Sequence, residues 1–230
     1  MRRPDAGGPV GVPVAWPTDG GRGQRPGARP HTLWRVTPVL SQLVPGILFG
    51  VTFAAWTVGE WVLVLRNLRS GAWRSRQDGG TNSLVTAGVL GGVVTGIVCA
   101  AHGVLGLPEP ALWLLVGLVI AWAGLLLRLW AVLTLGPSFT TTVVVRPEQV
   151  VVATGPYRYV RHPAYLGLLV LFLGLGLMLG DLASAVAMVV LPAIPLAWRI
   201  RVEEDALRSE LGSAYAEYAG GRARLIPGIW

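Results

Sequence analysis

The stretch LWLLVGLVIAWAGLLL, residues 112–127, is apolar on every side, and this property decides the fold. A surface helix of a soluble protein needs a polar face, whereas a helix without one lies in a large core or in a membrane. Only 13% of the 230 residues are charged, against roughly a quarter in a typical soluble domain. Too little polar surface remains to cover a soluble core, so the sequence predicts an integral membrane protein.

Other apolar stretches lie on both sides of this one. A membrane-spanning helix needs about 20 mostly apolar residues, and five segments approach or exceed that length: 36–59, 79–108, 111–127, 163–180 and 182–198. The shorter segments can borrow flanking residues whose charged ends reach the interface. We therefore expect an all-α integral membrane protein with about five transmembrane helices, the last two forming a C-terminal helical hairpin.

Composition divides the chain into three parts. Residues 1–33 are rich in Gly, Pro and Arg and are expected to form a disordered tail, because they cannot bury enough apolar surface. Residues 34–135 hold the N-terminal transmembrane helices, which we expect to serve as a scaffold. Residues 136–230 hold most of the polar motifs and are predicted to be the catalytic region.

The net charge of +7 comes from arginine, because the chain has no lysine. Arginines gather in the loops 66–83 and 136–162, whereas the turns at 108–110 and 181 have no basic residue. Positive loops stay in the cytoplasm and face anionic lipid headgroups, so the charge needs no nucleic-acid partner. The arginine-only, Ala/Gly-rich composition is typical of a GC-rich bacterial genome, and we expect a multi-pass protein of the bacterial inner membrane.

Glu60 is a charged residue near the far end of the first apolar stretch. Charges at membrane depth are costly and either pair with a partner or serve a proton path. Extension of the side chain to the interface, or an ion pair with Arg66, is the favoured interpretation, and a proton relay is the alternative.

The two predicted cytoplasmic ends of the hairpin are ATGPYRYVRHPAY, residues 153–165, and WRIRVEEDALRSELG, residues 198–212. Proline suits the first position of a helix, so His162-Pro163 marks a helix start. Contact with lipid headgroups would explain Arg158 and Arg161, but it would not explain the aromatic residues in the same segment. A helix N-terminus attracts an anion, and aromatic rings can hold a flat adenine or a sulfonium cation.

Charged residues on the second end of the hairpin are spaced four apart. Arg199 and Glu203 have this spacing, as have Arg201 and Asp205, so intrahelical salt bridges are one interpretation. Arg199 and Glu203 lie one turn deeper, where charges are costly and often functional.

The order LGPSFTTTVVV (135–145), VVATGPYRYVRHPAYLG (151–167), an apolar hairpin, RVEEDALRSELGSAYAEY (201–218) and RLIPGIW (224–230) resembles the isoprenylcysteine carboxyl methyltransferase family. This family is related to the phospholipid methyltransferases. The resemblance covers roughly residues 134–230. It implies a membrane-embedded S-adenosylmethionine-dependent methyltransferase whose cofactor pocket faces the cytoplasm.

The resemblance also implies roles for individual residues. The segment Gln149, Val150, Val151 and Val152 would line the cofactor site together with Tyr157. His162, Pro163, Ala164 and Tyr165 would contact the cofactor from the helix start, and Glu203 from the last helix. Arg199 would be the catalytic, substrate-binding arginine. Many relatives have His where this chain has Gln149, so only a backbone contact there would survive the change.

Carboxyl O-methylation of a lipophilic, isoprenoid-like acid from the bilayer is the function that the resemblance favours. A carboxylate is already ionised and needs no general base, so positioning and electrostatics suffice. Phospholipid or other amine N-methylation would need a base, for which His162 and Glu204 are the candidates. A nicotinamide-dependent membrane reductase is a further alternative. The sequence shows no metal-binding cluster and no dinucleotide-binding glycine motif.

A non-catalytic scaffold or a small transporter is the alternative from a different class. A transporter usually carries polar or ionisable groups near the middle of the bilayer, but here the polar groups gather at one interface. We therefore favour an enzyme.

Overall fold

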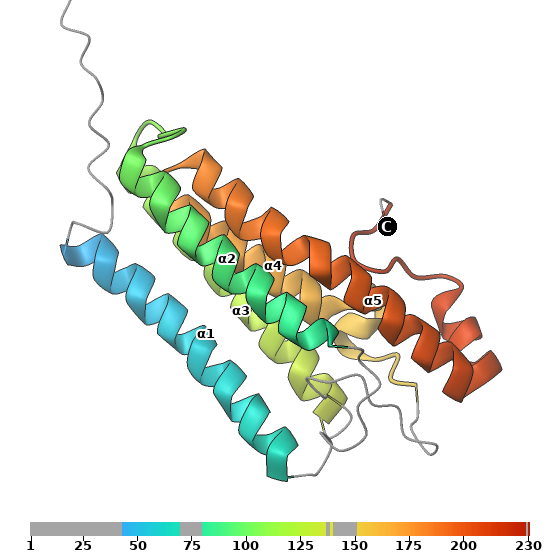
Figure 1. Ribbon diagram of the computed structural model, residues 1–230. Coiled ribbons are helices and arrows are strands. Elements are labelled where there is room, and N and C mark those ends of the chain that lie inside the picture. The colour runs from blue at the N-terminus through green and yellow to red at the C-terminus, as the bar shows by residue number, and fades with distance from the viewer. Residues whose placement is uncertain (1–42, 70–79, 137–138, 140–150, 229) are drawn as a thin grey trace, which may run out of the picture. The chain divides into compact units, whose positions relative to one another are not determined.

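The computed structural model describes residues 43–69, 80–136, 139, 151–228 and 230. The chain divides into two units, residues 1–35 and 36–230, and the predicted disordered tail lies outside the described residues. The described residues of the second unit form five α-helices: α1 (Leu43–Arg69), α2 (Thr81–His102), α3 (Pro110–Leu135), α4 (Pro163–Met178) and α5 (Leu182–Ala219) (Figure 1). A short 3₁₀ helix, η4 (Gly155–Arg158), precedes α4.

The prediction of an all-helical membrane protein is confirmed. Helices α1, α2, α3 and α5 are long and apolar enough to cross a membrane. Large apolar side chains such as Val119 and Leu133, which are 70% and 68% exposed, point away from the helix bundle. The fifth predicted span, α4, has only 16 residues, which corresponds to ~24 Å and is shorter than the ~30 Å hydrocarbon core.

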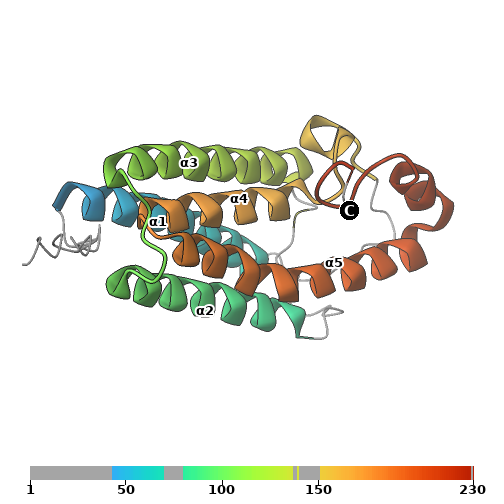
Figure 2. The same ribbon diagram turned by 90° about the horizontal axis from the view of Figure 1, so that it is seen from above.

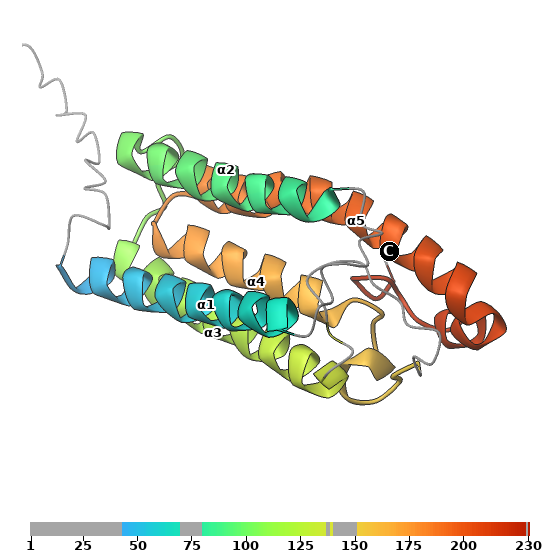
Figure 3. The same cartoon turned by 60° about the horizontal axis from the view of Figure 1, so that its bottom comes forward.

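Helix α4 lies between α3 and α5, and α2 packs along α5 (Figures 2 and 3). Glycines allow α3 and α4 to approach closely, since a Cβ atom at Gly124 would overlap the backbone of Leu171, and one at Gly174 the backbone of Ala121. Small residues at such contacts are the usual means by which membrane helices associate. Helix α4 is therefore held firmly along its length, with most of its side chains buried.

Two turns meet at one end of the bundle, the turn between α2 and α3 and the turn between α4 and α5. The backbone N–H of Leu105 donates to Asp181 Oδ2 at 2.8 Å, and the N–H of Leu182 donates to the carbonyl of Leu105 at 2.9 Å. Asp181 also caps α5 by accepting from the N–H of Ser184. The polar start of α4 and the arginine-rich part of α5 consequently lie toward the other end, as the predicted hairpin requires.

Helix α5 continues beyond the start of α4, and its helical geometry is interrupted at Gly212, where φ is 54°. Glycine tolerates this left-handed conformation because it has no Cβ atom. The chain then returns to α4: the N–H of Arg161 donates to the carbonyl of Ala223 at 2.9 Å, and that of His162 to Arg224 at 3.0 Å. The C-terminal segment thereby closes over the polar end of the hairpin.

Candidate active site

Tyr165, in the first turn of α4, connects two charged residues of α5. Its hydroxyl donates to Glu203 Oε2 at 2.7 Å and accepts from Arg199 Nε at 2.9 Å. Arg199 is buried and also donates to the Thr81 hydroxyl, at the start of α2, at 3.4 Å. Three helices thus position the arginine. Arg199 and Glu203, four residues apart on α5, are bridged by the Tyr165 phenol from α4.

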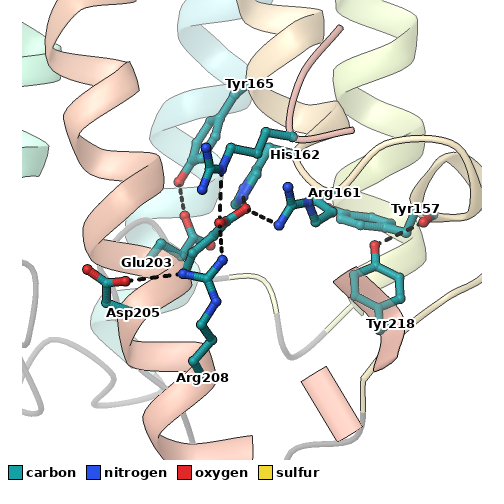
Figure 4. A network of polar contacts seen from close by, with 10 residues as sticks. Tyr157, Arg161, His162, Tyr165, Glu203, Asp205, Arg208 and Tyr218 are labelled. Carbon is teal, nitrogen blue, oxygen red and sulfur yellow. Dashed lines mark hydrogen bonds and ion pairs between the residues drawn. The ribbon is translucent and has the colours of Figure 1, made fainter. Parts of the chain in front are cut away.

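Glu204 is the centre of a second polar cluster and is fully buried. Its Oε1 lies 2.9 Å from Arg161 Nη1 and 3.3 Å from His162 Nε2. Its Oε2 accepts from Arg208 and from Arg224, each at 3.0 Å. Figure 4 shows Arg161, His162 and Arg208 gathered around this part of α5. The carboxylate therefore joins α4, α5 and the returning C-terminal segment.

Aromatic rings surround the start of α4. The rings of His162 and Tyr165 are stacked with centroids 5.6 Å apart, and Tyr218 donates to the carbonyl of Tyr157 at 2.9 Å (Figure 4). Burial, with the nearby Glu203 charge, raises the pKa of the Tyr157 phenol well above its usual range, so this group stays protonated at neutral pH. Tyr157 thus contributes a neutral, buried aromatic ring that packs against Ala164 in the first turn of α4.

A cavity of about 500 Å³ is lined in part by Tyr165 and Arg199. Its apolar lining includes Phe53, Trp56 and Trp61 of α1, Val89 of α2, Leu168 of α4 and Leu196 of α5. Polar residues in its lining are Thr57, Glu60, Asn82, Thr86, Arg128, Tyr165 and Arg199. This volume lies within the usual range for ligand sites. The lining combines apolar walls with two buried arginines, of which Arg128 is paired with Glu60, and such a lining suits a molecule with an apolar tail and an anionic head group.

The expected partner of Glu60 was wrong. Glu60 Oε1 lies 2.6 Å from both Nε and Nη2 of Arg128, on α3. Arg66 instead donates to the carbonyls of Gly136 and Phe139, at 3.1 Å each. Arg128 also donates to the carbonyl of Ala164 at 2.9 Å, so the ion pair connects α1, α3 and the start of α4.

The predicted site residues occupy different environments. Tyr165 and Glu203 are partly buried and hydrogen-bonded to each other, whereas His162, Pro163 and Ala164 are buried. Val151 and Val152 are partly buried and precede η4. Gln149 and Val150 lie outside the described residues. The structure brings Arg199, Tyr165 and Glu203 together, and places His162 against Glu204.

Apart from Glu60, sequence reasoning missed the residues that α1, α2 and α3 contribute to the cavity. Arg128 carried a usable signal, because an arginine within a long apolar helix is costly unless it has a partner. Thr81, Asn82 and Thr86 carried none, since such residues are common at helix starts.

The fold and this site define a membrane-embedded helical protein with a polar centre at one end and an apolar cavity beside it. The resemblance seen in the sequence is confirmed, because residues 115–209 match the model of the isoprenylcysteine carboxyl methyltransferase (ICMT) family. The matched segment includes α4, Tyr165, Arg199 and Glu203. It starts within α3 and leaves out α1 and α2.

Proteins of similar sequence are named as isoprenylcysteine methyltransferases. Protein-S-isoprenylcysteine O-methyltransferase B of Arabidopsis thaliana is 38% identical over 105 residues, which are 45% of this chain and 53% of the relative. Protein-S-isoprenylcysteine O-methyltransferase A of the same plant is 37% identical over 113 residues, 48% of this chain and 57% of the relative. The chain therefore spans about half the length of the curated relatives it matches.

A solved structure shares the fold. The eukaryotic intramembrane Ras methyltransferase ICMT superposes with a TM-score of 0.51 at 25% sequence identity, over 63% of this chain and 52% of that one. Over that part of the chain, the helical fold is similar to that of a membrane methyltransferase.

Proposed function

We propose that this protein is a membrane-embedded, S-adenosylmethionine-dependent methyltransferase that methylates the carboxylate of a lipophilic, isoprenoid-like acid. The observation that carries the proposal is the position of Arg199. Its guanidinium is buried, lines the cavity among apolar residues, and is joined through the Tyr165 hydroxyl to Glu203. The similarity of residues 115–209 to the ICMT family supports the same activity.

Residues around the start of α4 fit a methyl donor of this kind. Glu203 offers a carboxylate that can accept hydrogen bonds from an amino or hydroxyl group. The stacked rings of His162 and Tyr165, with the buried Tyr157, offer aromatic surface for an adenine or a sulfonium. In the proposal Val151, Val152, Pro163 and Ala164 border the same site, and the backbone of Gln149 and Val150 completes it. The cofactor supplies an activated methyl group on a sulfonium.

Arg199 would bind the acceptor carboxylate and aim one of its oxygens at the methyl group. Guanidinium and carboxylate match in shape and charge, and a water-poor surrounding strengthens the contact. The reaction forms an oxygen–carbon bond and breaks the sulfur–carbon bond, and no proton has to move. The contribution of the protein is therefore orientation and exclusion of water.

An amine acceptor would need a base that takes a proton, and this is the second candidate function. Glu204 accepts from Arg161, Arg208 and Arg224, and His162 faces the same carboxylate. Both candidate bases are therefore engaged in holding the structure together. This observation favours a carboxylate over an amine.

In the proposal, residues 136–230 form the catalytic region, and the helices of residues 34–135 provide scaffold and cavity wall. In this proposal the cofactor site lies at the cytoplasmic face of a bacterial inner membrane, which the arginine-rich loops support, and the acceptor reaches the cavity from the bilayer. The protein needs lipid and cofactor, but neither nucleic acid nor metal, for this chemistry.

The test is methyl transfer from labelled S-adenosylmethionine to a membrane lipid extract and to a prenylated cysteine, with the protein in lipid nanodiscs. We expect product that releases methanol in alkali, as methyl esters do. Arg199→Gln should abolish the transfer, whereas Arg201→Gln, an exposed arginine on the same helix, should not. Alkali-stable product would select amine methylation, and thermal stabilisation by NADPH alone would select a reductase.

A further inference from the structure

Arg158 and Arg222 are neighbours on the surface beside the start of α4, although 64 residues separate them in the sequence. Arg222 Nε donates to the carbonyl of Arg158 at 3.2 Å, and Arg222 Nη1 donates to the carbonyl of Tyr218 at 2.6 Å. Arg158 is exposed and Arg222 is partly buried. The fold thereby holds two cationic residues together, and we call them the Arg158–Arg222 patch.

The patch has no carboxylate partner in the described part of the chain. None of the ion pairs found among those residues includes Arg158 or Arg222, and the hydrogen bonds that Arg222 donates go to neutral carbonyls. Glu217, the acidic residue nearest to Arg222 in sequence, is exposed and belongs to none of these ion pairs. Arg161 is instead paired with the buried Glu204 at 2.9 Å. Of the two arginines that headgroup contact would explain, only Arg158 therefore remains for such a contact.

The patch lies at the level of the last turn of α3. Gly155, at the start of η4, is so close to α3 that an added Cβ atom would lie 2.8 Å from Thr134 Oγ1 and 3.4 Å from Trp130 Nε1. Trp130 is 50% exposed, and tryptophan near the end of a membrane helix is typical of the membrane–water interface. Arg158 ends η4, so it lies where lipid headgroups are expected.

Tyr159 adds an aromatic ring to the patch. The ring is 59% exposed, and its centroid lies 4.9 Å from the Cζ atom of Arg158. A guanidinium that stacks on a ring still presents its N–H donors at its edge. Because tyrosine combines an apolar body with a polar tip, an exposed ring at this level favours contact with a lipid over contact with a free anion in water.

We infer that the Arg158–Arg222 patch binds the headgroup of an anionic phospholipid, and that the bound lipid holds the C-terminal segment against the start of α4. A guanidinium matches the phosphate oxygens in charge and shape. The inference goes beyond the proposed function and does not depend on it, because neither arginine belongs to the proposed cofactor or acceptor site.

The patch is linked to the polar centre through the C-terminal segment. Arg222 directly precedes residues 223 and 224, whose carbonyls accept from the N–H groups of Arg161 and His162. Local opening of this segment breaks these two hydrogen bonds and moves Arg222 away from Arg158. A headgroup that contacts both arginines binds the closed form more tightly, so it opposes the opening.

The experiment measures amide hydrogen exchange of Arg161 and His162 at single-residue resolution, with the full chain in nanodiscs. One set of nanodiscs contains phosphatidylcholine, which has no net charge, and the other contains phosphatidylcholine mixed with phosphatidylglycerol. We expect exchange to be at least about fivefold slower with phosphatidylglycerol, from the order of magnitude for one basic residue at an anionic surface. Added salt should reduce the difference, because it screens exposed charges.

Two variants remove the patch, and a third is the matched control. Arg158→Gln and Arg222→Gln should each make the exchange rates in the two lipids nearly equal. Arg222→Gln also loses its hydrogen bonds to carbonyls, but this structural effect raises the exchange rates in both lipids alike and leaves their ratio unchanged. Arg201→Gln removes an exposed arginine of α5 outside the patch and should keep the wild-type ratio.

Three results would overturn the inference. The first is equal exchange of the wild type in the two lipids, and the second is an equal loss of the lipid effect in Arg201→Gln, which would indicate a general effect of surface charge. The third is slowing by millimolar glycerol phosphate in phosphatidylcholine nanodiscs as large as that by phosphatidylglycerol, because the site would then be one for free phosphate. Should Arg222→Gln not fold, Arg158→Gln, at an exposed position, still decides the matter.

Discussion

The hydroxyl of Tyr165 donates to Glu203 Oε2 at 2.7 Å, which joins the first turn of α4 to the middle of α5 across 38 residues of sequence. The same oxygen accepts from Arg199. One phenol therefore fixes both the proposed cofactor-binding carboxylate and the proposed acceptor-binding arginine.

Replacing Tyr165 by Phe removes this oxygen and keeps the ring. Arg199 and Glu203 then lose their common partner, and we expect methyl transfer to fall about tenfold or more, since a hydrogen bond to a charged group contributes about 1.5–3 kcal/mol. Steady-state kinetics in nanodiscs measures the effect. Tyr159→Phe, at an exposed tyrosine, is the matched control, and an equal loss there would contradict the role of Tyr165.

Glu203→Gln keeps the shape of the side chain and removes its charge. We expect the affinity for S-adenosylhomocysteine, measured by calorimetry, to fall at least about tenfold, because a charged acceptor is replaced by a neutral amide. Glu210→Gln changes an exposed residue farther along α5 and should leave the affinity unaltered. Undiminished binding by Glu203→Gln would remove this carboxylate from the cofactor site.

Glu204→Gln should destabilise the protein. The variant leaves Arg161, Arg208 and Arg224 without their shared anion in a buried position, and breaking a buried ion pair costs about 3 kcal/mol or more. Thermal unfolding in detergent should shift to a clearly lower temperature. Asp205→Asn removes a neighbouring carboxylate whose side chain is 75% exposed, and its midpoint should stay near that of the wild type.

Gly174→Ala tests the close packing of α3 and α4. A Cβ atom there would overlap the backbone of Ala121, and we expect a loss of about 1–3 kcal/mol from forced displacement. Gly59→Ala is the control on α1, where nothing lies within 4 Å of the added atom. That variant should be neutral or slightly more stable, because alanine favours a helix over glycine. Equal stability of the two variants would contradict the packing.

The sequence predicted the helices well because a run of apolar residues is a local property that a membrane enforces along the chain. It also predicted that residues 153–165 and 198–212 meet, since a tight turn at Asp181 makes α4 and α5 antiparallel. Which residues of these two segments contact each other was harder to predict. Consecutive helix residues point about 100° apart, so Glu203 faces Tyr165 while Glu204 faces Arg161 and Arg224.

The contacts of α1 could not be predicted from the sequence. Glu60 and Arg128 are 68 residues apart, and nothing near Glu60 indicates which helix lies opposite. Arg66 was the nearest cation in sequence, but on the folded helix it contacts the chain after α3. Long-range pairs of this kind depend on how the helices pack, which apolar patterning leaves open.

The return of the chain to the start of α4 has a consequence for biosynthesis. Residues 223 and 224 hydrogen-bond to Arg161 and His162, and Arg224 also binds Glu204. A ribosome makes these residues only after the described helices α1 to α5. A nascent chain that still lacks residues 223 and 224 would therefore contain every described helix but could not yet form the complete polar centre around Glu204.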